Sequence, residues 1–392
     1  MHIPSERIYS EMRSNNAIVR YVPTNGGTET ALLIKAPTPS LKAMIAGCAF
    51  KLIYGKKDNF LCIGISIEDV PGAPLLISNE QIVPEEHCAL LEAVKQKNLP
   101  IFLFNEMDIC MASAELYFSD EDSLKLLDFI GDTKLLSTGS FNDTVSFAVD
   151  CFIHSIDKTK KFPNAHEIPI IETIPEISEW KTINIYYLSS ESANKINITE
   201  EKEGANFEST IWSCLTSVFP ETLYKNPHVQ NGNKKREFTD VFAHYKYGSF
   251  LIETKDLSVF QSGYNRESER RVKGIKDQVN KGIKQLVGAV KSLKSGDVLF
   301  DINGSQIIID RSIPPHCIIL ITELMPFGDW NDITNQLIDA AKKTGAFFHL
   351  LDFSEFITLL KQSSGNPELI DYNLINRFKL FLEKKSVFIK GI

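Results

Sequence analysis

Hydrophobic residues in the second half of the chain recur with two different spacings. Apolar positions three and four apart predict helices, and continuous apolar runs predict strands. Pro220 ends the first of these helices, and Asn303-Gly304 is a typical hairpin turn. In chain order, the pattern predicts a helix at 204–219, a long helix at 267–294, a hairpin at 298–309, a buried strand at 317–321, a helix at 330–344, a strand at 347–351 and a helix at 374–382.

The first half of the chain has a similar mixture of patterns. It predicts strands at 17–22, 31–36, 49–54, 61–67 and 101–104 and helices at 85–97 and 121–130, the second of which Ser119 would cap together with Asp122. Three prolines between positions 163 and 175 favour a linker. We therefore expect an α+β domain over 1–155, a linker over 156–180 and a second domain over 181–392. The protein as a whole is predicted to be of the α/β (α+β) class.

Residues 236–255 carry the clearest chemical pattern. Asp240 begins one strand-like run, and a second apolar run, 250–252, leads into Glu253 and Lys255. Glu253 and Lys255 are two residues apart, so their side chains point to the same face of a strand. If the two runs form a hairpin, Asp240 lies beside them, and two carboxylates and an ammonium converge. The triplet by itself is common, because the same spacing occurs at 132–134, 179–181, 200–202 and 383–385 without a buried strand before it.

This arrangement resembles the PD-(D/E)xK phosphodiesterases, the restriction-endonuclease-like superfamily. Asp240 matches the single acid, and Glu253 and Lys255 match the (D/E)xK pair, whereas the proline of the family name is replaced by Thr239. The resemblance covers about residues 200–355 and implies a mixed central sheet flanked by helices. The core of the superfamily runs helix, three strands, helix, strand. Its first strand would have to lie between Pro220 and Arg236, where the strand pattern is weak.

The resemblance also assigns roles to two flanking helices. In the superfamily the helix before the first strand often carries an acid that faces the metal, and Glu208 fits that position. Alternatively, Glu208 is a first-turn acid favoured by the helix dipole. The long helix of the family offers a Gln or Lys to the scissile phosphate. Here Gln278, Lys281 and Gln285 form one polar stripe, with Gln285 as the first choice and Lys281 as the second, although solvent exposure is the commoner role of such residues.

The implied chemistry is metal-dependent hydrolysis of a phosphodiester. Mg²⁺ prefers a few carboxylate oxygens and several waters, and Mn²⁺ can substitute for it. Asp240 and Glu253 would bind the ion, with the backbone carbonyl of Thr254 as a third ligand, and Lys255 would orient or deprotonate the attacking water. If Glu208 reaches the site, a second ion can bind.

Charge is distributed unevenly along the chain. The net charge is −8, but residues 225–294 contain 15 Lys and Arg against 7 Asp and Glu, a local balance of +8, so the remainder carries −16. This asymmetry places basic surface around the candidate site, where phosphates would bind. Any one charged cluster is about as often a solvated face. The residues expected to contact DNA phosphates are Lys234, Lys235, Arg236, Arg270, Arg271 and Lys281.

Composition sets the remaining bounds. The 392 residues are 43% hydrophobic, with no apolar run long enough to span a membrane and no signal-peptide core at the start. The seven scattered cysteines fit reduced thiols, so we expect a cytoplasmic protein. The chain has no CxxC pair or His cluster typical of zinc sites, and no Gly-rich nucleotide loop or GxSxG motif. In the first domain, Cys88 and Glu92 are four apart beside His87, a pattern more typical of core or surface residues than of a metal site.

Two classes of function remain. The first is a DNA endonuclease, which family analogy places in restriction or anti-phage defence. The second is a catalytically silent protein of the same fold that binds nucleic acid or serves as a scaffold subunit. RNA is an alternative substrate, but no aromatic stacking platform favours it. Target recognition, contact with partner proteins and homo-oligomer formation are all open for the first domain.

Overall fold

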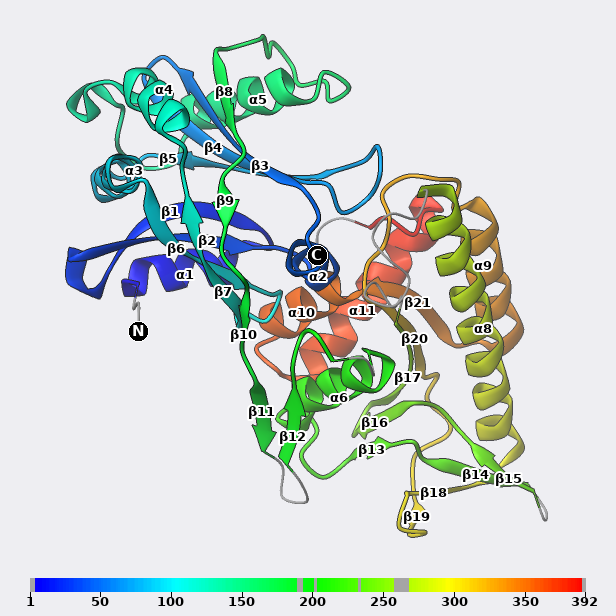
Figure 1. The fold of residues 1–392 in the computed structure, drawn as a ribbon. Coiled ribbons are helices and arrows are strands. Elements are labelled where there is room, and N and C mark those ends of the chain that lie inside the picture. Colours follow the sequence, from blue (N-terminus) through cyan, green and yellow to red (C-terminus); the bar gives the residue numbers. More distant parts are fainter. Residues whose placement is uncertain (1–3, 189–192, 201–202, 232–233, 257–267, 390–392) are drawn as a thin grey trace. The chain divides into compact units, whose positions relative to one another are not determined.

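The computed structural model describes residues 4–188, 193–200, 203–231, 234–256 and 268–389. They form two compact units, which are coloured along the sequence in Figure 1. Unit 1 contains the described residues up to Ile185 and Asn197–Thr199. Unit 2 contains the described residues from Tyr186 to Ile196 and from Glu200 onward.

Two β-sheets form the framework of unit 1. Their strands are β1 (Ile18–Thr24), β2 (Glu29–Lys35), β3 (Phe50–Lys57), β4 (Phe60–Ile67), β5 (Leu75–Gln81), β6 (Asn98–Phe104), β7 (Cys110–Tyr117), β8 (Ile170–Thr173), β9 (Glu176–Ile177) and β10 (Lys181–Thr182). One sheet has the order β1-β2-β6-β7-β10, with β9 also paired to β7, and the other has the order β5-β4-β3-β8. The first sheet is mixed, because β1 and β2 are antiparallel whereas β2 and β6 are parallel.

Helices complete unit 1. They are α1 (Glu6–Ser14), α2 (Thr38–Ile45), α3 (Pro84–Gln96), α4 (Asp120–Ile130) and α5 (Asp143–Ile156), with short 3₁₀ turns η1 (Asn25–Gly27) and η2 (Thr133–Leu135). The largest core cluster joins apolar residues of β1, β2, β6 and β7 to those of β3, β4, α3 and α4. As predicted, the Ser119 side chain caps α4 by accepting a hydrogen bond from the Asp122 N–H. The five strands and two helices predicted in this half are confirmed to within a few residues.

The segment 156–180 differs from the linker predicted for it. β8 pairs with β3, and β9 pairs with β7, so this proline-containing segment belongs to the sheets of unit 1. Pro169 and Pro175 lie beside these short strands at sheet edges, where a missing N–H donor is tolerated. The prolines of this segment therefore accompany edge strands instead of a linker, and unit 1 extends to Ile185.

A mixed five-stranded sheet lies at the centre of unit 2. The strands of this unit are β11 (Ile185–Leu188), β12 (Ala193–Ile196), β13 (Leu223–Lys225), β14 (His228–Asn231), β15 (Lys234–Glu237), β16 (Val241–Tyr245), β17 (Gly248–Lys255), β18 (Val298–Phe300), β19 (Gln306–Ile307), β20 (His316–Ile321) and β21 (Phe347–Asp352). The central order is β13-β16-β17-β20-β21, in which β16 and β17 form an antiparallel hairpin and β17, β20 and β21 are parallel. A second sheet has the order β15-β14-β18-β19, and β11 pairs with β12.

Helices cover both faces of the central sheet. They are α6 (Glu203–Thr216), α8 (Ser268–Ser295), α9 (Asn331–Thr344), α10 (Phe353–Gln362) and α11 (Pro367–Lys384). α8 packs on β17 and β20 and also contacts α9 (Figure 1). On the opposite face, the His316 side chain stacks on Phe250 and shares a hydrogen bond of 2.8 Å with Asp371 of α11.

The observed unit 2 confirms the predicted mixed sheet flanked by helices. Each predicted helix and strand is present, with α11 longer than expected and α10 not predicted. α8 forms where the sequence places an apolar residue on every turn, and its buried stripe includes Ile275, Val279, Leu286 and Val290. As the crossover between the parallel strands β17 and β20, α8 runs back along them, so its N-terminal half extends toward their carboxyl ends.

Candidate acidic site at the end of strand β17

The hairpin of β16 and β17 brings Asp240, Glu253 and Lys255 together. Val241 pairs with Ile252, and one step further along the same register places Asp240 beside Glu253. The hairpin turn contains only Lys246 and Tyr247, because Tyr245 pairs with Gly248. The short turn fixes the register of the two strands, and a slip of one residue would move Asp240 to the other face. The predicted convergence of these three side chains is therefore present in the fold.

Glu253 and Lys255 form a close ion pair. Lys255 Nζ lies 2.8 Å from Glu253 Oε2 and 3.7 Å from Asp240 Oδ2. The Glu253 side chain is 2% exposed, whereas that of Asp240 is 18% exposed. Burial and, after it, the Asp240 carboxylate raise the pKa of Glu253 to about 7, against the opposing effect of the Lys255 ammonium. Two carboxylates thus share one ammonium, which leaves excess negative charge when both are ionised.

Thr254 holds the Asp240 carboxylate in place. Asp240 Oδ2 accepts hydrogen bonds from the Thr254 backbone N–H at 2.7 Å and from its hydroxyl at 3.1 Å. In an extended strand the N–H and C=O of one residue point to the same side. The Thr254 carbonyl is therefore directed toward the Asp240 side of β17, as the predicted metal ligand requires. Next to it, the hydroxyl of Thr239 donates to the Ile252 carbonyl and ties the two strands together.

Glu208 of α6 approaches the same acids. Burial raises the pKa of its carboxyl, the Lys225 ammonium opposes this, and the Asp240 carboxylate adds to the rise. Lys225 Nζ lies 3.5 Å from Glu208 Oε1, yet this buried oxygen makes no hydrogen bond within the described part of the chain. The first-turn acid of α6 is Glu203, so the alternative that Glu208 serves the helix dipole is wrong. Its role as an acid facing the site stays a prediction.

α8 passes over the site at Gly282. A Cβ atom at this position would lie 3.2 Å from two side-chain carbons of Ile319 and 3.7 Å from Lys255 Cε. Gln278 is half-buried and precedes Gly282 by four residues, about 6 Å toward the carboxyl ends of the strands. Gln285 is exposed and follows Gly282, so it lies in the opposite direction. Gln278 is therefore better placed than the predicted Gln285 to reach a phosphate at the acidic site. Lys281 is exposed and lies beside Gln278.

The residues predicted to contact phosphates have different surroundings. The guanidinium of Arg236 donates to Ser292 Oγ at 2.8 Å and to the Gly288 carbonyl at 3.4 Å, which anchors β15 to α8. Arg271 is half-buried and pairs with Glu323 at 3.3 Å. Lys235 and Arg270 are exposed, and the side chain of Lys234 lies outside the described residues. Their contacts with nucleic acid stay predictions.

The donors at this site fit a hard cation better than a transition metal. No group of three or more His, Cys, Asp and Glu side chains poised to bind a metal occurs within the described residues. Two carboxylates, a backbone carbonyl and water are nevertheless a ligand set that Mg²⁺ accepts, since it keeps several waters. The raised pKa of Glu253 also fits a bound cation. Burial and the Asp240 carboxylate make the ionised form of Glu253 costly, and a cation would offset that cost.

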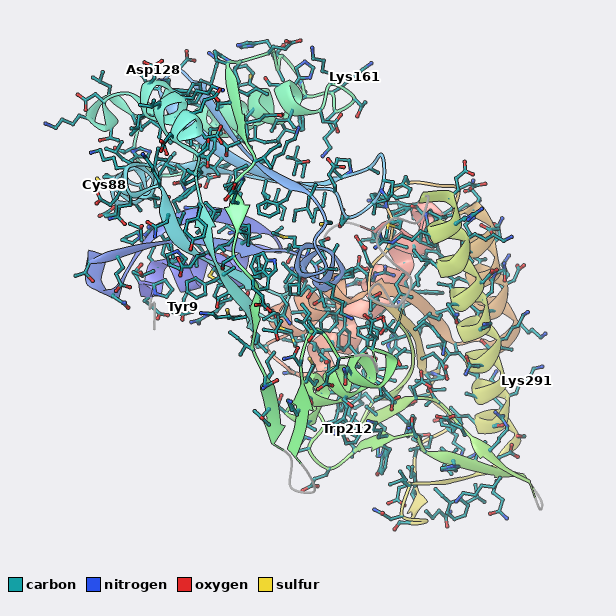
Figure 2. All side chains as sticks on the ribbon, in the orientation of Figure 1. Tyr9, Cys88, Asp128, Lys161, Trp212 and Lys291 are labelled. Carbon is teal, nitrogen blue, oxygen red and sulfur yellow. The ribbon has the colours of Figure 1, made fainter. Side chains whose placement is uncertain are left out.

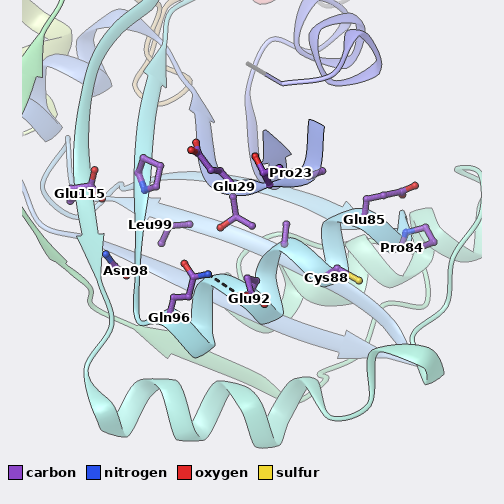
Figure 3. Close-up of a pocket in the computed structure, with 15 residues that line it drawn as sticks. Pro23, Glu29, Pro84, Glu85, Cys88, Glu92, Gln96, Asn98, Leu99 and Glu115 are labelled. Atoms are coloured by element: carbon purple, nitrogen blue, oxygen red, sulfur yellow. Dashed lines mark hydrogen bonds between the residues drawn. The ribbon is translucent and has the colours of Figure 1, made fainter. Parts of the chain in front are cut away.

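A pocket in unit 1 has a different character. It has a volume of about 600 Å³, and its lining includes Cys88 and the carboxylates of Glu29, Glu85, Glu92 and Glu115 (Figure 3). Glu92 accepts a hydrogen bond of 2.9 Å from Gln96. His87 is buried and pairs with the Gln81 carbonyl at 2.6 Å, so it is a core residue rather than a partner of Cys88. The acidic lining would repel phosphates.

No protein-family model, curated protein or solved structure matches the chain. None of the helices in the described ranges combines the length and apolarity that crossing a bilayer requires.

Proposed function

We propose that the protein is a metal-dependent nuclease that hydrolyses DNA phosphodiester bonds, most readily as an endonuclease. The observation that carries the proposal is the convergence of Asp240, Glu253 and Lys255 on the α8 face at the carboxyl end of β17. Among the described residues, the buried Glu253 and the partly buried Asp240 share the Lys255 ammonium, an arrangement that is costly to maintain unless a function uses it.

The order of elements around these residues supports a restriction-endonuclease-like core. Along the chain, α6 is followed by β13, β16 and β17, then by α8 and β20, which matches the helix, three strands, helix, strand order of that superfamily. β13 pairs with β16 and supplies the first strand, which the sequence pattern indicates only weakly. β14, β15 and the β18–β19 hairpin lie outside this order in a separate sheet.

The residues of the site would act in distinct ways. Asp240 and Glu253, with the Thr254 carbonyl, would hold Mg²⁺ or Mn²⁺, which when bound lowers the pKa of water and polarises a phosphoryl oxygen. Lys255 would orient the attacking water and stabilise negative charge that develops on the phosphate. Thr254 positions Asp240 through its two hydrogen bonds. The apolar strands behind Glu253 exclude water from one side of the site.

Supercoiled plasmid provides a direct test. We expect the full-length protein to nick or linearise it with Mg²⁺ or Mn²⁺ and to leave it intact with EDTA. Asp240→Ala, Glu253→Ala and Lys255→Ala should each reduce the cleavage rate by at least about 100-fold. The matched control is Lys246→Ala, which removes an exposed lysine from the turn of the same hairpin.

The outcomes separate the alternatives. Metal-dependent cleavage that survives in all three variants excludes this site as the catalytic centre. DNA binding without cleavage under any metal condition favours the catalytically silent protein. Faster cleavage of RNA than of DNA of the same sequence would reassign the substrate.

A further inference from the structure

The outward face of α8 carries a row of lysines. At 100° per residue, Lys273, Lys281, Lys284 and Lys291 lie within about 80° of one another and on the side of the helix away from Gly282. All four are exposed, and Figure 2 shows Lys291 directed outward from α8. Asp277 is the one acid among the described residues of this face. The face therefore has a strong positive charge.

These lysines are not engaged within the protein. None of the four has an ion-pair or hydrogen-bond partner in the part of the chain that the structure describes. Lys276, on the flank of α8 toward α9, contrasts with them, since it pairs with Asp332 at 2.8 Å. Four like charges on one helix face, offset by Asp277 alone among the described residues of that face, repel one another and lower stability slightly, which a bound polyanion would relieve.

The chemistry of α8 indicates which polyanion. Residues 268–295 contain no aromatic side chain, so this helix lacks the stacking platform typical of proteins that bind single strands. The four lysines extend over 18 residues, which is about 27 Å along the helix axis. At about 3.4 Å per step, that distance corresponds to about eight base pairs of a duplex. Contacts of this kind reach phosphates and carry no sequence information.

The row also connects to the acidic site. Lys281 neighbours Gln278 on the side of α8 where the guanidinium of Arg236 contacts Gly288 and Ser292. A DNA backbone that runs from the acidic site past Gln278 would thus reach Lys281 before the other three lysines. We propose that the outward face of α8, formed by Lys273, Lys281, Lys284 and Lys291, binds the phosphate backbone of duplex DNA over about eight base pairs beside the acidic site. This inference rests on the proposed nuclease function and names its substrate as a duplex longer than the site itself.

The test measures binding separately from cleavage. Full-length protein is titrated with a fluorescent 30-base-pair duplex in EDTA at several salt concentrations. In Lys284→Gln/Lys291→Gln, the slope of log K against log salt should decrease in magnitude by about 2, because two phosphate contacts are lost. The control Lys379→Gln/Lys384→Gln changes the net charge equally through exposed lysines of α11 and should leave the slope unchanged. Glutamine preserves helix propensity, so folding is not at issue.

Each result decides between defined alternatives. An unchanged slope in the α8 variant overturns the inference even if plasmid cleavage depends on Lys255. A reduced slope without any cleavage supports the α8 surface and contradicts the nuclease proposal. Equal affinity for a 30-nucleotide single strand overturns the assignment to a duplex. Displacement of the duplex by poly-glutamate at equal charge concentration would show a general acidic-polymer surface and also overturn it.

Discussion

Gly282 of α8 lies against the Lys255 side chain and close to Ile319 of β20. A Cβ atom at Gly282 would lie 3.7 Å from Lys255 Cε and only 3.2 Å from two carbons of Ile319. Glycine is normally unfavourable in a helix interior, by about 1 kcal/mol relative to alanine. Its presence here allows α8 to approach Ile319 closely beside Lys255, which pairs with Glu253 and Asp240.

A larger side chain at Gly282 should therefore damage both the packing and the site. We expect Gly282→Val to lower the free energy of unfolding by about 1–3 kcal/mol, the usual cost of overpacking, and to reduce metal-dependent cleavage by displacing Lys255. Gly274→Val is the matched control, because a Cβ at Gly274 meets no atom within 4 Å. Thermal unfolding and plasmid cleavage measure the two effects. Equal stability of both variants would contradict the close packing.

Local patterns explain why the acids could be predicted from the sequence. The apolar run Phe250–Ile252 is buried in the sheet, and the polar residues 253–255 follow it directly, so the strand and its polar end are visible in the sequence. With a two-residue turn, antiparallel pairing then places Asp240 beside Glu253. The strands β14 and β15 are less visible because their sequences are polar, since they lie in a small sheet with β18 and β19, outside the central sheet.

Tertiary placement explains what the sequence could not predict. Gln278 and Gln285 are seven residues apart and share one stripe of α8, so periodicity cannot choose between them. The choice between them depends on which turn of α8 lies over the carboxyl end of β17. The close approach of Gly282 to Ile319 fixes that position.

Stability should depend on pH through Glu253. Its pKa is raised from 4.5 to about 7 in the folded protein, so the folded state binds this proton more tightly than the unfolded state. The contribution of Glu253 protonation to the free energy of unfolding is then fully present below about pH 4.5 and is lost as the pH rises to about 7. A pKa difference of about 2.5 corresponds to about 3 kcal/mol at most.

Glu253→Gln should escape this loss because the amide does not ionise. We expect the unfolding temperature of the variant to exceed that of the wild type at pH 8 and the difference to shrink toward pH 5, in metal-free buffer. Differential scanning calorimetry across this range measures it. A difference that does not vary with pH would mean that Glu253 ionises freely in the folded protein.

The hydroxyl of Thr254 should affect metal affinity through Asp240. Thr254→Val removes the hydroxyl donor to Asp240 Oδ2 but keeps the backbone donor. Partners that orient a metal ligand typically contribute 10–100-fold in affinity, so we expect about 10-fold more Mg²⁺ to be needed for half-maximal cleavage. The maximal rate should recover at high Mg²⁺. Thr254→Ser, which keeps the hydroxyl, is the control, and an equal shift in both variants would contradict the role of this hydrogen bond.

Glu208 offers a test in which stability and activity should change in opposite directions. Burial and the Asp240 carboxylate raise its pKa, so keeping Glu208 ionised costs stability at pH 8. Glu208→Gln should therefore unfold at a temperature equal to or above that of the wild type at this pH. If its carboxylate contributes to a second ion, the same variant should cleave at least about 10-fold more slowly and depend less steeply on Mg²⁺ concentration. The control is Glu221→Gln, an exposed acid before β13, which should change neither property. A purely structural Glu208, paired only with Lys225, would instead lose stability on substitution and leave the Mg²⁺ dependence unchanged.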